Sequence, residues 1–209
     1  MSRNFIIFIS LLLVGFAGLV FMQRSAQQSA PDVQGSNNVY GNLDSQVTLT
    51  EYVDFQCEAC YAFYPTVKEV KEKYKDRVKF QIKYFPITSS HQHALAAAAT
   101  AQAAAKQGKF FEMHDLLFER QKSWENSQNR DEVFASYAKE IGLDMAKFNE
   151  DVTSRETQAI INADLEEVQK LGGNGTPTFA LNGEKIDNPD NTVEAFSKLL
   201  DTALAETEN

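Results

Sequence analysis

The pattern of apolar and polar residues predicts a strand, a helix and a second strand at the start of the folded region. Residues 46–55 are rich in β-branched and aromatic residues, which is typical of a strand. Residues 57–74 carry an apolar stripe at helical spacing, with Pro65 where the helix should kink. Residues 78–84 alternate apolar and polar side chains, as a half-buried strand does. Two strands joined in this way by a helix form a parallel pair.

The chain from about residue 88 to residue 171 is expected to be helical. The segments with helical periodicity are residues 94–105, 110–118, 130–141, 144–151 and 154–171. A glycine-rich break ends this block. Asn182 and Gly183 then predict a hairpin turn between strands 176–181 and 184–186, and residues 193–205 close the chain as a helix. The order predicts an α/β fold whose mixed sheet has a helical subdomain inserted between its two halves.

An apolar segment precedes this domain. Within residues 1–22, the run from residue 5 is broken only by Ser10 and is long enough to span a bilayer. Two interpretations stay open: an uncleaved membrane anchor, which the length of the run favours, and a cleaved signal peptide. Both place the rest of the chain outside the cytoplasm. Residues 23–38 are polar and predict a flexible linker, so the folded domain is expected over residues 39–209.

The composition is acidic. The chain has 20 Lys and Arg residues, of which Arg3 and Arg24 lie in or beside the apolar segment. The rest of the chain has 18 basic and 29 acidic residues, which gives it a net charge of about −11. Such a surface argues against binding to nucleic acid or to anionic headgroups. We interpret the charge as keeping an exported domain soluble.

Cys57 and Cys60 are the only cysteines, and they form a Cys-x-x-Cys pair at the start of the predicted helix. Unpaired backbone N–H groups and the helix dipole favour an anion there. The thiolate is the form of cysteine that attacks disulfides. A disulfide between Cys57 and Cys60 would enclose only two residues and would therefore stabilise the fold little. The pair therefore predicts a reversible redox site in which Cys57 is the attacking sulfur and Cys60 the resolving one.

Two further positions are candidates for this site. Strand alternation puts Glu51 on the apolar face, where a buried carboxyl could carry the proton of Cys60; an edge position would instead leave it exposed. Pro177 opens a strand, with either a cis or an ordinary trans peptide bond. A cis Pro177 facing the sulfurs would leave the Thr176 backbone free to pair with an extended substrate.

Taken together, these residues resemble the thioredoxin fold, and in particular its DsbA-like branch. The similarity covers about residues 39–205, and Glu51 matches the family's buried acid and Pro177 its cis proline. The 116 residues between Cys60 and Pro177 resemble the helical insertion that defines this branch. The matching stretches are residues 52–60, 108–118 and 175–183.

The two residues between the cysteines depart from the family's pattern. Many relatives carry proline after the first cysteine, and the strongly oxidising ones carry Pro-His, whereas this chain has Glu58 and Ala59. A glutamate beside the thiolate should raise the pKa of Cys57 and make the disulfide a weaker oxidant. We expect a Cys57 pKa between roughly 3.5 and roughly 7, the range of related nucleophilic cysteines.

The resemblance implies a membrane-tethered, extracytoplasmic thiol–disulfide oxidoreductase that introduces disulfides into reduced exported proteins. It implies reoxidation by a membrane enzyme, a monomeric state and no metal or organic cofactor. A reductase or isomerase and a non-catalytic binding module on the same fold remain as alternatives. The polar segment 23–38 is too short for the extra domain of dimeric exported isomerases, which disfavours the isomerase.

A zinc site is a weaker alternative. His91, His93 and His114 could join the two cysteines, but the spacing of His91 and His93 is not the usual one for zinc ligands. We interpret His91 and His93 as polar residues at a helix start, and His114 as a partly buried helix residue.

Overall fold

The computed structural model describes residues 33–207, and the folded unit begins at Gln34. The predicted anchor within residues 1–22 and most of the predicted linker lie outside the described residues. Within the described range, no helix combines the length and the apolar character that crossing a membrane requires.

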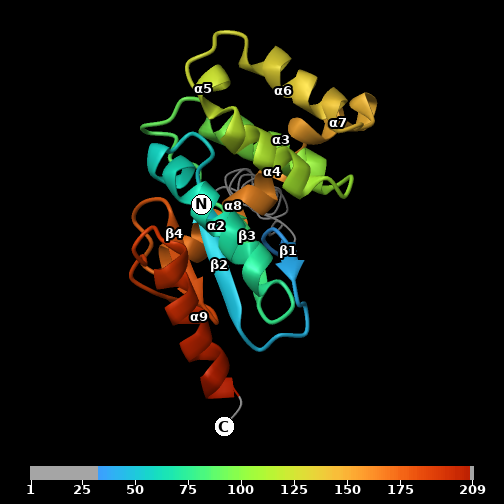
Figure 1. The fold of residues 1–209 in the computed structure, drawn as a ribbon. Helices are drawn as coiled ribbons and strands as arrows, with labels where there is room; N and C mark the ends of the chain where they lie inside the picture. Colours follow the sequence, from blue (N-terminus) through green and yellow to red (C-terminus); the bar gives the residue numbers. More distant parts are fainter. Residues whose placement is uncertain (1–32, 208–209) are drawn as a thin grey trace, which may run out of the picture. The chain divides into compact units, whose positions relative to one another are not determined.

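A five-stranded mixed sheet forms the centre of the unit, as predicted (Figure 1). The strand order is β1-β3-β2-β4-β5. Strands β2 and β3 run parallel, with a helix as the crossover, whereas β1, β4 and β5 pair antiparallel with their neighbours. The strands are β1 Asn38–Gly41, β2 Thr48–Val53, β3 Lys79–Tyr84, β4 Thr178–Leu181 and β5 Glu184–Lys185.

Helices cover both faces of this sheet. Helices α2 and α9 share one core with one face of the strands, whereas α8 packs on the other face. The inserted helices α3 to α7 lie beyond the end of the strands that leads into α2 (Figure 1). The helices are α2 Glu58–Tyr74, α3 Ala94–Ala105, α4 Phe110–Glu119, α5 Gln121–Trp124, α6 Arg130–Glu140, α7 Met145–Val152, α8 Arg155–Lys170 and α9 Val193–Thr207.

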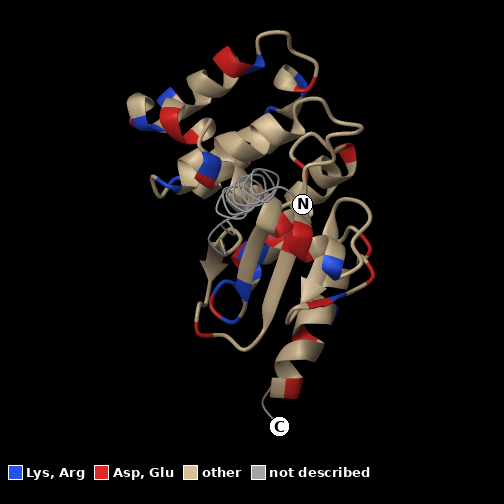
Figure 2. Ribbon diagram, turned by 180° about the vertical axis from the view of Figure 1, so that it is seen from behind, with Lys and Arg blue, Asp and Glu red and all other residues tan. Residues whose placement is uncertain are grey.

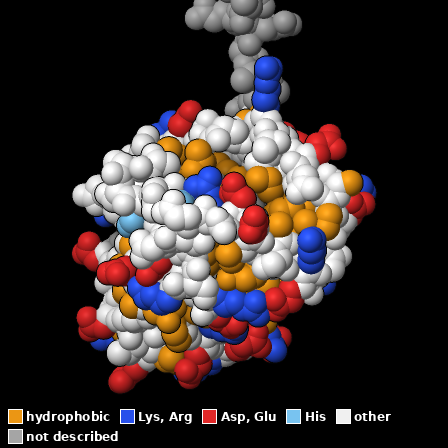
Figure 3. All heavy atoms as spheres, turned by 90° about the horizontal axis from the view of Figure 1, so that it is seen from above, with side chains coloured by type: hydrophobic (Ala, Val, Ile, Leu, Met, Phe, Trp, Pro, Cys, Tyr) orange, Lys and Arg blue, Asp and Glu red, His pale blue; other side chains and the backbone are white. Residues whose placement is uncertain are grey.

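The helical insertion shares an apolar core with the ends of β2 and β3 and with α2, and it has a partly apolar surface. Figure 3 looks onto this end of the unit, where hydrophobic side chains form patches between charged ones. One hollow between α3, α6 and α7 is lined by apolar side chains that include Phe134, Phe148 and Val152, with Arg130 at its edge.

The start of the folded unit differs from the prediction. Ser36 and Asn38, which the sequence assigned to a flexible linker, are buried. Asn38 begins β1, and its side-chain amide donates to the Ile82 carbonyl at 3.3 Å. The folded unit therefore begins at residue 34, inside the range that the sequence assigned to the linker. The polar composition of residues 36–38 did not indicate a strand. The side chains of Ser36 and Asn38 can be buried because they hydrogen-bond to β3.

Strand β3 is more deeply buried than its alternating pattern predicts. It lies between β1 and β2, and α8 covers one of its faces. Lys83 is consequently only 7% exposed, although most charged residues lie on helices and loops (Figure 2). The expectation of a half-buried strand is wrong for this end of β3.

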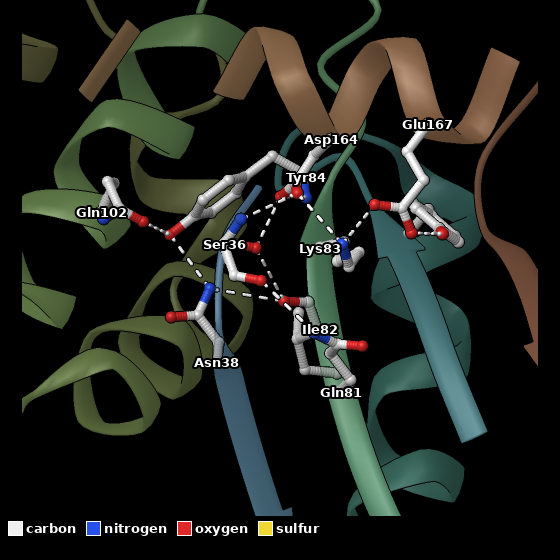
Figure 4. Close-up of polar contacts among 10 residues, drawn as sticks. Ser36, Asn38, Gln81, Ile82, Lys83, Tyr84, Gln102, Asp164 and Glu167 are labelled. Carbon is white, nitrogen blue, oxygen red and sulfur yellow. Dashed lines mark hydrogen bonds and ion pairs between the residues drawn. The ribbon is translucent and has the colours of Figure 1, made fainter. Parts of the chain in front are cut away.

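Lys83 is accommodated by a polar network centred on Asp164 (Figure 4). Lys83 Nζ lies 3.5 Å from Asp164 Oδ1 and 2.5 Å from Glu167 Oε2. The Asp164 carboxylate also accepts from the backbone N–H groups of Ser36 and Tyr84, each at 2.9 Å. A fully buried carboxylate is stable only with such partners. The network therefore ties the first residues of the unit to β3 and α8.

Replacing Asp164 with alanine should strongly destabilise the protein. The change leaves two buried N–H groups without acceptors and removes one carboxylate from Lys83, and breaking a buried pair costs about 3–5 kcal/mol. Urea unfolding measures the loss. The exposed Glu166 on the same helix supplies the control, since Glu166→Ala should change stability by less than about 0.5 kcal/mol. Equal unfolding free energies for the two variants would contradict this account.

Candidate active site

The turn between β2 and α2 holds the first cysteine through backbone contacts. The Asp54 carbonyl accepts from the Cys57 N–H at 3.1 Å, and its side chain accepts from the Gln56 N–H at 2.8 Å. The buried Gln121 side chain of α5 donates to the carbonyls of Phe55 and Cys57, at 2.8 and 3.1 Å. Nothing in the sequence around Gln121 indicates this role, because it depends on the packing of the insertion against the turn.

Cys57 and Cys60 take the predicted positions at the start of α2. Cys57 is the N-cap residue, with extended backbone angles, and its side chain is half-buried. Cys60 lies one turn further along α2 and is completely buried. Both are free thiols. One sulfur is thus accessible to a partner and the other is shielded behind it.

The two thiols have opposite pKa shifts. The pKa of Cys57 falls to about 5, chiefly because the Cys60 thiol hydrogen-bonds to its sulfur. Thr176 and the backbone N–H groups of Cys60 and Ala59 also favour the thiolate, while burial opposes it. The pKa of Cys60 is raised well above its ordinary value, mainly by burial. Cys57 is therefore ionised at neutral pH, whereas Cys60 keeps its proton.

Glu58 has less influence on Cys57 than the sequence suggested. Its side chain is 85% exposed, and its carboxylate lies 3.6 Å from Lys122 Nζ. The charge is therefore solvated and paired, and the direct hydrogen bonds to the Cys57 sulfur outweigh it. The resulting pKa lies inside the expected range.

Thr176 and Pro177 lie against the first cysteine. Strand β4 begins directly after them and pairs with β2, which brings the Thr176 carbonyl oxygen to 3.5 Å from Cys57 Sγ. The peptide bond between Thr176 and Pro177 is cis. The Thr176 hydroxyl is buried and has no hydrogen-bond partner among the described residues. It is therefore available to donate to the sulfur.

Glu51 lies on the central strand β2, between Ile82 of β3 and Phe179 of β4, so the edge-exposed alternative is excluded. It is 5% exposed, and burial raises its pKa to about 7, with the Lys71 ammonium opposing. Lys71 of α2 is itself buried, which lowers its pKa. The sequence reasoning missed Lys71, although it lies four residues after Val67 and hence on the apolar stripe of the helix.

A small cavity borders Glu51 and is lined by Tyr64, Lys71 and His114 among others. The charge of Glu51 acts on Cys60 and contributes to its raised pKa. Among the described residues, none hydrogen-bonds to the carboxyl group of Glu51. The group can therefore exchange a proton with little rearrangement of its surroundings.

The three histidines do not form a metal site with the cysteines. His91 pairs with Asp54, and His93 contacts Arg130 and the Ser127 carbonyl. His114 is buried among aromatic rings, and burial lowers its pKa to about 4. No group of three or more His, Cys, Asp or Glu side chains within the described range could hold a metal ion.

The chain is similar to known proteins over most of its length. The family model described as thioredoxin matches residues 34–202. A protein of Salinispora tropica named Na(+)/H(+) antiporter NhaA 3 is 35% identical over 169 residues, which are 81% of this chain and 25% of that protein. A protein of Herminiimonas arsenicoxydans named Na(+)/H(+) antiporter NhaA is 31% identical over 72% of this chain. The chain thus spans about a quarter of the length of these curated relatives.

Solved structures share the fold. A thioredoxin-like oxidoreductase from Silicibacter pomeroyi is 26% identical, with a TM-score of 0.65 over 79% of this chain and 90% of that one. BdbD from Bacillus subtilis is 21% identical, with a TM-score of 0.71 over 82% and 96% of the two chains. The α-DsbA1 of Wolbachia pipientis is 21% identical, with a TM-score of 0.67 over 87% and 96%. The predicted fold is confirmed, and with the family model it supports thiol–disulfide oxidoreductase chemistry.

Replacing Thr176 with valine should raise the pKa of Cys57. The substitution keeps the shape of the side chain and removes the hydroxyl that favours the thiolate. A hydrogen bond to a charged group contributes about 1.5 kcal/mol or more, so we expect a rise of about one pH unit. Thiolate absorbance of the reduced protein measures it. Thr178→Val is a nearby control, because that hydroxyl donates to the Gly175 carbonyl. An unchanged Cys57 titration in Thr176→Val would rule out the contact.

Replacing Glu51 with glutamine should stabilise the protein at high pH only. Since the folded-state pKa is raised from 4.5 to about 7, the stability that Glu51 contributes is present below pH 4.5 and lost as pH rises through 7. A difference of about 2.5 pH units corresponds to about 3 kcal/mol. Unfolding titrations should therefore show a gain of up to about 3 kcal/mol at pH 9 and little change at pH 4. A gain independent of pH would contradict the burial of an ionisable Glu51.

Proposed function

The chain belongs to the thioredoxin family, and we propose that it is an extracytoplasmic oxidase that introduces disulfides into exported proteins. The observation that carries this proposal is the pKa of about 5 at the half-buried Cys57, beside a shielded Cys60. A thiolate stabilised at neutral pH favours the reduced form of the pair. A disulfide whose reduced form is stabilised is a good oxidant.

The reaction is a pair of thiol–disulfide exchanges. A client thiolate attacks Cys57 Sγ of the oxidised pair, the bond between Cys57 and Cys60 breaks, and Cys60 leaves as a thiolate that takes up a proton. A second client thiolate then attacks the client sulfur of the mixed disulfide, and Cys57 leaves as a stabilised thiolate. The client gains one disulfide and the pair of cysteines gains two electrons.

Glu51 supplies the proton that Cys60 needs. Its pKa of about 7 leaves it partly protonated at neutral pH, and a small cavity borders it. Cys60 requires such a donor, because burial makes its free thiolate unfavourable. Lys71 stabilises the Glu51 carboxylate after the transfer, which limits the cost of leaving a buried charge.

Extended clients would lie along the segment before β4. Thr176 presents its backbone beside Cys57, and a surface hollow continues from Asn174 past Pro177 to Asn188. An extended client strand could pair with the backbone there, which provides affinity without sequence preference. Tyr61 on the first turn of α2 is an exposed aromatic side chain that could contact apolar client residues.

A location at the outer face of a membrane is part of this proposal. The apolar run of residues 5–22 supports it, and so do the curated relatives, in which the matched region is one part of proteins named as antiporters. A membrane enzyme that accepts electrons from the reduced pair would complete the cycle, and the domain would act as a monomer.

Reoxidation of a reduced, unfolded client protein tests this function. The oxidised protein should restore client disulfides in direct proportion to the amount added, whereas Cys57→Ser should have no effect. In Cys60→Ser, the Cys57 thiolate should attack a disulfide of an oxidised client, release one client thiolate and remain in a mixed disulfide, because no Cys60 thiol is left to resolve it. Mass spectrometry detects this adduct. Equilibration with glutathione should give a potential nearer to DsbA, about −120 mV, than to thioredoxin, about −270 mV.

Two outcomes would favour the alternatives. A potential at or below that of thioredoxin, together with cleavage of client disulfides by the reduced protein, would indicate a reductase. Binding of clients that Cys57→Ser retains, with no change in client disulfides for the wild type, would indicate a non-catalytic binding module.

A further inference from the structure

A histidine–aspartate pair lies next to Cys57. His91 Nδ1 is 2.7 Å from Asp54 Oδ2. The Asp54 side chain is completely buried and also accepts from the N–H groups of Gln56 and Ile87, each at 2.8 Å. Asp54 thus acts only as an acceptor. The hydrogen of the His91 contact must then be on Nδ1, which leaves Nε2 with a free lone pair when the ring is neutral.

The His91 ring is accessible to solvent beside Cys57. His91 and Cys57 line the same surface hollow. The His91 side chain is 24% exposed, and no described residue is recorded as hydrogen-bonding to Nε2. Asp54 fixes the relative positions of the two, since its carboxylate holds His91 and its backbone carbonyl accepts from the Cys57 N–H at 3.1 Å.

We propose that His91 is the general base that removes the proton from the client thiol as it attacks Cys57. The proposal deepens the proposed oxidase function and rests on it. The client thiol gives its proton to His91 Nε2, and the client sulfur bonds to Cys57 Sγ. The bond between Cys57 and Cys60 breaks, and Cys60 takes its proton from Glu51. His91 then releases its proton to water.

The chemistry needs such a base at neutral pH. An ordinary cysteine thiol has a pKa of about 8.5, so only a few per cent of a client thiol is ionised at pH 7. A positioned general base typically increases the rate of a reaction that needs such a proton transfer by about a hundredfold or more. Glu51 cannot serve here, because it lies in the interior on the side of Cys60.

The charges around His91 suit this role. Asp54 faces it from the turn after β2, and Glu58 and Glu125 line the same hollow from the start of α2 and the end of α5. Lys122 pairs with both of these glutamates and moderates their charge. Behind them, His93 and Arg130 contact each other. The proton that His91 takes up during the transfer therefore adds a positive charge next to these carboxylates.

The pH dependence of client attack tests the proposal. His91→Asn keeps a side-chain N–H for Asp54 and removes Nε2. The measurement is the second-order rate at which the oxidised protein reacts with a single-cysteine peptide, from pH 6 to pH 9.5. We expect the second-order rate of the variant to be at least tenfold below that of the wild type at pH 6. At pH 9.5 the two rates should agree within about twofold, because the peptide thiol is then ionised without a general base. His91→Gln should show the same pattern.

Controls separate this role from a structural one. Ser90→Ala, in the same hollow, should match the wild type at every pH, and the Cys57 titration of the reduced His91 variants should be unchanged. A rate ratio independent of pH, or a shifted Cys57 titration in the His91 variants, would overturn the proposal. If the wild type fails to react with the peptide at any pH, the proposed oxidase function itself is wrong.

Discussion

The site depends on one hydrogen bond between two thiols of unequal burial. Cys60 is completely buried and therefore keeps its proton, and its S–H group stabilises the thiolate of Cys57. If Cys60 were as exposed as Cys57, the burial that raises the pKa of Cys60 would be lost. The fold supplies this inequality by placing Cys57 at the N-cap of α2 and Cys60 one turn inside the core. Gln121 and Thr176 then fix the turn from two other parts of the chain.

Two buried acid–base pairs on opposite faces of the sheet show how burial serves different ends. Asp164 and Lys83 belong to a network in which several N–H groups also bind the carboxylate, so its surroundings are filled and fixed. Glu51 and Lys71 lie on the α2 side, with no recorded hydrogen bond to Glu51 and a small cavity beside it. The first arrangement stabilises one structure. The second leaves a proton free to move, which is what the resolving sulfur requires.

Much of the fold could be predicted from periodicity, because several long helices carry an apolar stripe, and α3 could be predicted from its run of alanines. The start of β1 could not be predicted in this way, because Asn38 is polar and belongs to a strand only through its pairing with β3. The burial of Lys83 could not be predicted either, because its charge is balanced by Asp164, which lies 81 residues away along the chain. At the site, Cys57, Cys60 and Glu51 followed from motif and alternation. Roles that depend on contacts between distant segments, such as that of Lys71, needed the coordinates.

Local contacts, not the net charge, set the chemistry of the first cysteine. An acidic chain and a neighbouring Glu58 both suggest a thiolate of raised pKa. Yet charges exposed to solvent are screened over roughly 8 Å at physiological ionic strength, and Glu58 is further offset by Lys122. The Cys60 thiol and the N–H groups of Ala59 and Cys60 hydrogen-bond directly to the sulfur. The residue after the first cysteine can therefore vary in charge while a low pKa persists, as long as the first turn of α2 is kept.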